Sequence, residues 1–134
     1  MKSAKYIITE DEDCLVVLSE FPRFWGHVMV CLKKHKELHN ELTEKENALL
    51  FGHAHKMAKI LEAAFKPSRC YIAALGAEQN LLNTCPHIHI NIIPVYDKQL
   101  KPSDVFTWEN GVYTGTENEW ISLQNTLKSG LITL

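Results

Sequence analysis

The most constraining feature of this sequence is the segment 87–94, where polar and apolar side chains alternate with a period of two. Such alternation is typical of a β-strand with one face buried and the other presented. His87, His89 and Asn91 would share the presented face, with the intervening isoleucines in the core. The two imidazoles would lie about 7 Å apart, which suits neutral rings that act on one bound group. An amphipathic strand with a solvated polar face explains the same pattern.

The composition fits one ordinary globular domain, with 46% hydrophobic and 22% charged residues and a net charge of −2. There is no basic block, so neither nucleic acid nor a membrane is expected as a partner. The four cysteines form no Cys-x-x-Cys pair, and residues 1–14 contain no apolar signal-peptide core. No stretch approaches the ~18 apolar residues of a membrane span. We therefore expect a cytoplasmic protein with reduced thiols.

The hydrophobic pattern along the chain predicts an α+β fold with an antiparallel sheet. Apolar runs predict further strands at 6–8, 14–18, 27–32 and 71–75. The capping-box sequence 43–46 predicts the start of a helix of about six turns that ends before Pro67. A second capping box at 116–119 predicts a C-terminal helix that ends before Gly130, whereas the order of 96–115 is not predicted. Pro94 is expected to mark the end of regular strand pairing, or an edge.

Several of these segments together resemble one known family. They are Gly26-His27-Val28-Met29-Val30, the Lys33-Lys34-His35 exit, the long helix, and Pro86-His87-Ile88-His89-Ile90-Asn91-Ile92-Ile93-Pro94. The combination resembles the histidine triad family of small nucleotide hydrolases and transferases, whose motif is His-φ-His-φ-His-φ-φ with φ apolar. The resemblance covers about 14–94 of a single domain 1–134, with 95–134 as a C-terminal extension. It implies about five antiparallel strands, one long helix packed on them and a C-terminal helix.

The resemblance also implies catalytic roles for three histidines. His89, at the middle triad position, would attack the α-phosphate of a nucleotide and form a nucleotidyl-histidine intermediate that water cleaves. A neutral imidazole is nucleophilic near neutral pH, so this role suits the side chain. His87 would orient His89, and His27 would complete the imidazole network behind it.

The remaining family positions depart from the usual pattern. Asn83 and Thr84 stand where the family places phosphate-binding groups, and Ser19 stands at the position of a ribose-binding Asp or Asn, with Glu20 as a substitute. Asn91 occupies the third triad position in place of His. An amide donates a hydrogen bond to phosphate but cannot protonate a leaving group, and such acid assistance is typically worth about 10²–10⁴-fold. We therefore expect the first step to depend on how good the leaving group is.

Three functional hypotheses follow. The first is a hydrolase that acts on the α-phosphate of a purine nucleotide, either a nucleoside phosphoramidate or a dinucleoside polyphosphate, with no cofactor and no metal and as a homodimer. The alternative is a nucleotidyl transferase of the same superfamily, or a nucleotide-binding module with little turnover because of Asn91. The third is a structural metal protein, since His35 and His39 have the i, i+4 spacing of zinc ligands. A solvated loop is the preferred explanation of that pair, and zinc bound by His27, His87 and His89 is expected to be adventitious and not catalytic.

Overall fold

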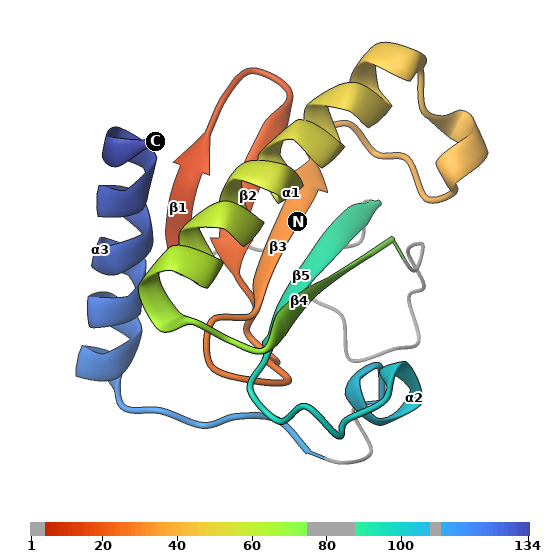
Figure 1. The fold of residues 1–134 in the computed structure, drawn as a ribbon. Helices are drawn as coiled ribbons and strands as arrows, with labels where there is room; N and C mark the ends of the chain where they lie inside the picture. The colour runs from red at the N-terminus through yellow and green to blue at the C-terminus, as the bar shows by residue number, and fades with distance from the viewer. Residues whose placement is uncertain (1–4, 75–87, 108–110) are drawn as a thin grey trace.

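The computed structural model of this chain describes residues 5–74, 88–107 and 111–134. Within them, five strands form one antiparallel sheet in the order β1-β2-β3-β5-β4. The strands are β1 (Ile7–Glu10), β2 (Cys14–Leu18), β3 (Val28–Leu32), β4 (Arg69–Ala73) and β5 (His89–Val95). The helices are the 3-10 turn η1 (His39–Glu41), α1 (Glu44–Phe65), α2 (Pro102–Val105) and α3 (Glu117–Thr133). The long helix α1 crosses one face of the sheet and α3 stands beside β1 (Figure 1). The predicted α+β architecture is confirmed.

Helix α1 begins and ends where the sequence predicts. The Thr43 side chain accepts a hydrogen bond from the Glu46 backbone N–H at 3.1 Å, and the Glu46 carboxylate accepts one from the Thr43 backbone N–H at 2.9 Å. This reciprocal pair satisfies two N–H groups that a helix N-terminus otherwise leaves unpaired. At the other end Lys66 adopts the left-handed conformation, with φ of 49°, directly before Pro67. The helix therefore has 22 residues, about six turns.

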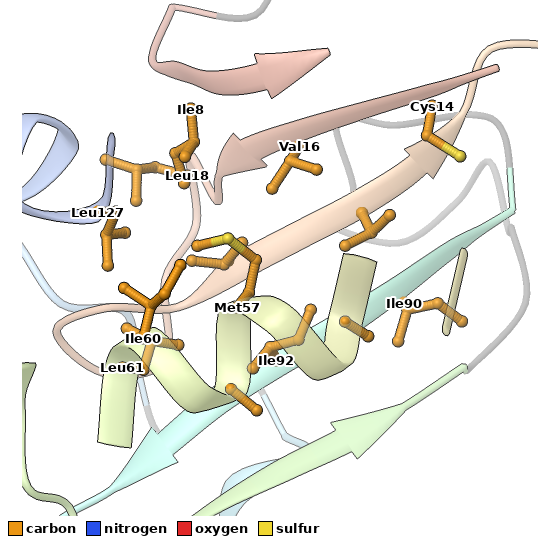
Figure 2. Packing of buried hydrophobic residues seen from close by; sticks show 14 of the residues in the cluster. Ile8, Cys14, Val16, Leu18, Met57, Ile60, Leu61, Ile90, Ile92 and Leu127 are labelled. Carbon is orange, nitrogen blue, oxygen red and sulfur yellow. The ribbon is translucent and has the colours of Figure 1, made fainter. Parts of the chain in front are cut away.

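The main core lies between the sheet and the two long helices. Residues at alternate positions of β2, β3 and β5 meet Met57, Ile60 and Leu61 of α1 and Leu127 of α3 (Figure 2). Ile90 and Ile92 belong to this core and are fully buried. Because side chains alternate along a strand, His89 and Asn91 face the other side of the sheet. The predicted alternation of side chains between two faces is thus confirmed from Ile88 onward, but the face expected to be presented is buried too, with His89 3% and Asn91 2% exposed.

The middle of the sheet brings the predicted site residues together. Strand β5 pairs with β3 so that Cys31 lies opposite His89 and Met29 lies opposite Asn91. This ladder ends at Ile92, whereas β5 continues to pair with β4 through Pro94 to Val95. Pro94 therefore marks the end of pairing on the β3 side alone, where its missing N–H costs no hydrogen bond.

One helix boundary was predicted wrongly. Helix α3 continues through Gly130 to Thr133, beyond the predicted end. A Cβ atom at residue 130 would lie 2.5 Å from Cγ2 of Ile60, so the glycine permits close approach of α3 to α1. The residue acts as a packing position and not as a helix stop. No helix in the described part of the chain is long and apolar enough to cross a membrane.

Candidate active site

A tight loop before β3 positions the first histidine. Gly26 has a φ of 95°, a region that favours glycine, and a Cβ there would lie 3.1 Å from both Leu61 and Pro94. The backbone N–H of His27 donates to the Phe24 carbonyl at 3.1 Å and closes the turn. The geometry of this turn explains why a glycine directly precedes His27. Only glycine makes this turn without strain, and the turn delivers His27 to the start of β3.

The hydrogen bonds of His27 identify which ring nitrogen carries the proton. The backbone N–H of Arg23 donates to Nδ1 at 3.0 Å, so Nδ1 has no hydrogen. In the neutral ring the hydrogen is then on Nε2, which donates to Oδ1 of Asn91 at 3.0 Å. Burial lowers the pKa of His27 to about 4, and the nearby His89 and Arg23 add to this lowering. The ring is therefore neutral at pH 7, with a fixed tautomer.

This hydrogen bond also orients the amide of Asn91. Because Oδ1 accepts the hydrogen bond from His27, the NH₂ group is the end directed away from that ring. At that end Asn91 can only donate a hydrogen bond, and it has no acidic proton to give up. With His27 also neutral, neither side chain serves as a general acid near pH 7.

His89 lies on the same face of β5 as Asn91, two residues earlier, and is close enough to His27 to affect its pKa. Its side chain is only 3% exposed. A nucleophile must be reached by its substrate. His89 can therefore act in catalysis only if a substrate gains access to this buried ring. The structure thus brings together His27, His89 and Asn91. The predicted residues His87, Asn83 and Thr84 lie outside the described part of the chain.

Ser19 links the backbone of this site to a cavity. Its N–H donates to the His27 carbonyl at 3.0 Å, and its hydroxyl accepts a hydrogen bond from the Phe21 N–H at 3.2 Å. Ser19 is 5% exposed and lines a cavity of about 280 Å³. The other residues lining the cavity are Lys5, Tyr6, Glu20, Gly115, Glu117 and Trp120. A role for Ser19 in binding ribose stays a prediction.

Sequence reasoning missed Arg23, which connects the site loop to the C-terminal extension. Its guanidinium donates to the backbone carbonyls of Val105 at 2.7 Å, Asp104 at 3.0 Å and Gly111. Its backbone N–H holds Nδ1 of His27. The side chain is buried, and burial lowers its pKa. No local pattern could have revealed a residue whose partners lie more than eighty positions away.

His35 and His39 do not share a helix, in agreement with the preferred explanation of this pair as part of a loop. His35 precedes η1 and lies 3.2 Å from the Glu37 carboxylate, and His39 packs edge-on against Phe51. Within the described residues, neither belongs to a group of three potential metal ligands.

Comparisons with known proteins agree with the fold and with the sequence motif. The family model for the HIT domain matches residues 2–98. A histidine triad nucleotide-binding protein from Sulfolobus tokodaii, described as hypothetical, superposes with a TM-score of 0.74 at 23% identity, over 96% of this chain and 85% of that one. A zinc-bound histidine triad family protein from Mycobacterium smegmatis gives 0.73 at 17% identity, over 98% and 86%. Plasmodium falciparum diadenosine triphosphate hydrolase gives 0.69 at 20% identity, over 98% and 79%. No curated protein matches the chain.

Proposed function

The chain belongs to the HIT domain family, and on this premise we propose that it is a nucleotide hydrolase with His89 as its nucleophile. The substrate would be a purine nucleoside phosphoramidate or a dinucleoside polyphosphate. The observation that carries the proposal is the contact between His27 and Asn91, on the face of the sheet that also bears His89. This contact joins the upstream Gly-His turn to the triad strand.

The proposed reaction has two steps. A ring nitrogen of His89 attacks the α-phosphorus, a P–N bond forms, and the bond to the leaving group breaks with its electron pair going to that group. Water then attacks the same phosphorus, the P–N bond breaks with its electron pair returning to the ring nitrogen of His89, a proton of the water passes to solvent, and the nucleoside monophosphate leaves. The amide NH₂ of Asn91 would donate to a phosphate oxygen and stabilise the charge that develops in each step.

The site chemistry makes the first step sensitive to the leaving group. Asn91 has no acidic proton, and His27 remains neutral because burial lowers its pKa to about 4. Neither Asn91 nor His27 therefore protonates the atom of the leaving group that departs from phosphorus. General acid help is worth about 10²–10⁴-fold, so the weakly basic phosphate leaving group of a dinucleoside polyphosphate should be strongly favoured over the basic amine of a phosphoramidate. A series of adenosine 5′-phosphoryl compounds with graded leaving-group basicity measures this dependence.

The nucleophile is tested by His89→Ala, with His55→Ala on the exposed face of α1 as the matched control. We expect His89→Ala to abolish turnover of a fluorogenic adenosine phosphoramidate and of a diadenosine polyphosphate, while the control keeps the parental rate. Rapid quench of the parent should trap a nucleotidyl adduct on His89. Parental turnover by His89→Ala would exclude the assigned nucleophile.

Substrate access to His89 is tested separately because the ring is buried. Titration of the ¹⁵N-labelled protein with AMP should shift the ring signals of His89, while those of the exposed His55 stay in place. If AMP binds but leaves the His89 signals unchanged, phosphate does not reach this ring and the mechanism is wrong.

The second candidate function is nucleotide binding without turnover, and the specific observation that favours it is Asn91. Calorimetry with AMP or GMP beside a turnover assay separates the two functions. A binding module would hold the nucleotide tightly, fail to cleave either substrate, and remain inactive as Asn91→His. An enzyme that lacks acid assistance would become faster as Asn91→His, most of all with poor leaving groups.

We also propose a homodimer that extends the sheet. Strand β4 is an edge of the described sheet, and its Ile72 side chain is 43% exposed although it lies opposite the buried Ile92. An edge strand with an exposed apolar residue is a natural pairing surface. Light scattering should give twice the mass of 15.3 kDa, and Ile72→Lys should reduce it to one chain. A parent of monomeric mass would refute this assembly.

A further inference from the structure

A second cluster of metal-ligating side chains lies away from the triad, where the β1–β2 turn meets α1. Potential ligand atoms of Asp11, Cys14 and His53 all lie within 4.8 Å of one another. Oδ2 of Asp11 is 2.7 Å from Nε2 of His53. The cluster joins segments that the sequence separates by 42 positions, and Cys14 occupies one end of the core in Figure 2.

The carboxylate of Asp11 is oriented by its own turn. Oδ1 accepts hydrogen bonds from the backbone N–H groups of Cys14 at 2.7 Å and Asp13 at 2.9 Å. These bonds hold one oxygen and direct the other, Oδ2, toward His53. The geometry supplies one carboxylate oxygen, one sulfur and one imidazole nitrogen around a common centre. This mixture of oxygen, sulfur and nitrogen donors matches the ligand preferences of zinc and cobalt.

The local charge also favours a cation. The turn carries four consecutive acidic residues, of which Glu10 pairs with Lys33 at 2.9 Å. Burial raises the pKa of Cys14 to about 11, and the negative charges of Asp11 and Asp13 contribute to this rise. Without a cation the cysteine is a thiol at neutral pH. A bound divalent cation would reverse this balance, because it stabilises the thiolate and offsets the carboxylates.

We propose that Asp11, Cys14 and His53 bind a divalent transition-metal cation of the zinc class, with water completing a four-coordinate site. Ligands about 2.0–2.3 Å from zinc are roughly 3.5 Å apart at tetrahedral angles. The cation would enter between Asp11 and His53, replace their hydrogen bond, and displace the proton of Cys14. The site is separate from the proposed hydrolytic centre and would stabilise the contact between the β1–β2 turn and α1.

The test is a Co²⁺ titration of tag-free, metal-depleted protein, followed by absorption. We expect one equivalent of Co²⁺ to bind with a thiolate-to-cobalt charge-transfer band, to release about one proton, and to be displaced by Zn²⁺. Zn²⁺ should also raise the melting temperature. His53→Gln should weaken Co²⁺ binding at least about tenfold, since even the loss of an outer-shell partner costs that much. Cys14→Ser should remove the charge-transfer band.

Matched controls make each outcome decisive. His55→Gln lies two residues from His53 on the same helix and should bind Co²⁺ like the parent. Cys31→Ser and His89→Ala should also keep the band, because both residues lie on the other face of the sheet. His53→Gln keeps the core intact, so it remains informative if Cys14→Ser unfolds. Absence of the band in the parent, or its survival in His53→Gln, would overturn the proposal.

Discussion

The role of Arg23 gives the sharpest prediction. The variant is Arg23→Met, which keeps an apolar side chain of similar length and removes the hydrogen-bond donors of the guanidinium. The bond to the Val105 carbonyl is fully buried, whereas those to Asp104 and Gly111 are partly buried. We assign about 2 kcal/mol to the first bond, within the range of about 1.5–3 kcal/mol for hydrogen bonds to charged groups, and about 1 kcal/mol to each of the others, because partial exposure to solvent weakens them. The sum predicts a loss of about 4 kcal/mol in the free energy of unfolding.

Urea unfolding measures this loss. With a slope near 2 kcal/mol per molar, the midpoint should fall by about 2 M. The matched control is Arg69→Met, because Arg69 also donates to a backbone carbonyl, that of Lys98 at 2.9 Å, but on the exposed surface. Exposed interactions of this kind contribute under about 1 kcal/mol, so the control should change little.

The same variant tests the link between Arg23 and the candidate active site. Because the backbone N–H of Arg23 holds Nδ1 of His27, movement of this loop should disturb the tautomer of that ring. Imidazole ¹⁵N shifts of the parent should report a hydrogen on Nε2 alone, and those of Arg23→Met should report a mixture. If Arg23→Met costs no more stability than Arg69→Met, or leaves the His27 tautomer unchanged, the three carbonyl bonds do not position the site.

The remaining predictions concern pH and helix packing. The folded pKa of His27 is about 4, below its ordinary value of 6.5, so its stabilising contribution is complete above pH 6.5 and is lost as the pH falls toward 4. We expect a loss of about 3 kcal/mol over that window, measured by urea unfolding at several pH values, and a flatter profile for His27→Gln. Gly130→Ala should destabilise by about 1–3 kcal/mol, because the new methyl group meets Ile60. Gly52→Ala, in α1 with open space around it, should stabilise by up to about 1 kcal/mol in the same assay.

Much of the fold could be predicted because its signals are local. The alternation around Ile90 specifies a strand whose two faces differ, and the reciprocal hydrogen bonds of Thr43 and Glu46 need only four consecutive residues. The error at Gly130 has a physical cause. Glycine often ends a helix, and only the position of Ile60 on another helix shows that here it permits close packing.

The site could be predicted in part for the same reason. His89 and Asn91 share a strand, so their common face follows from the period of two. Contacts between segments that are distant in the sequence leave no comparable pattern in the sequence. Helical spacing shows that His53 does not face His55, but it does not show that His53 meets Asp11 of a β-turn. In the same way, no local rule connects Arg23 to the carbonyls of the C-terminal extension.

Arg23 and the carbonyls that accept its hydrogen bonds are far apart in the sequence, and this fixes the order in which the two are synthesised. Arg23 and Val105 are 82 positions apart, so the five strands of the described sheet are synthesised before the carbonyls that accept from this guanidinium leave the ribosome. A polypeptide that stops after Val95 lacks all three carbonyls that accept hydrogen bonds from the Arg23 guanidinium. The segment that contains Asp104, Val105 and Gly111 therefore belongs to the structure around the ring of His27, and the contacts of the Arg23 guanidinium form only after this segment has been synthesised.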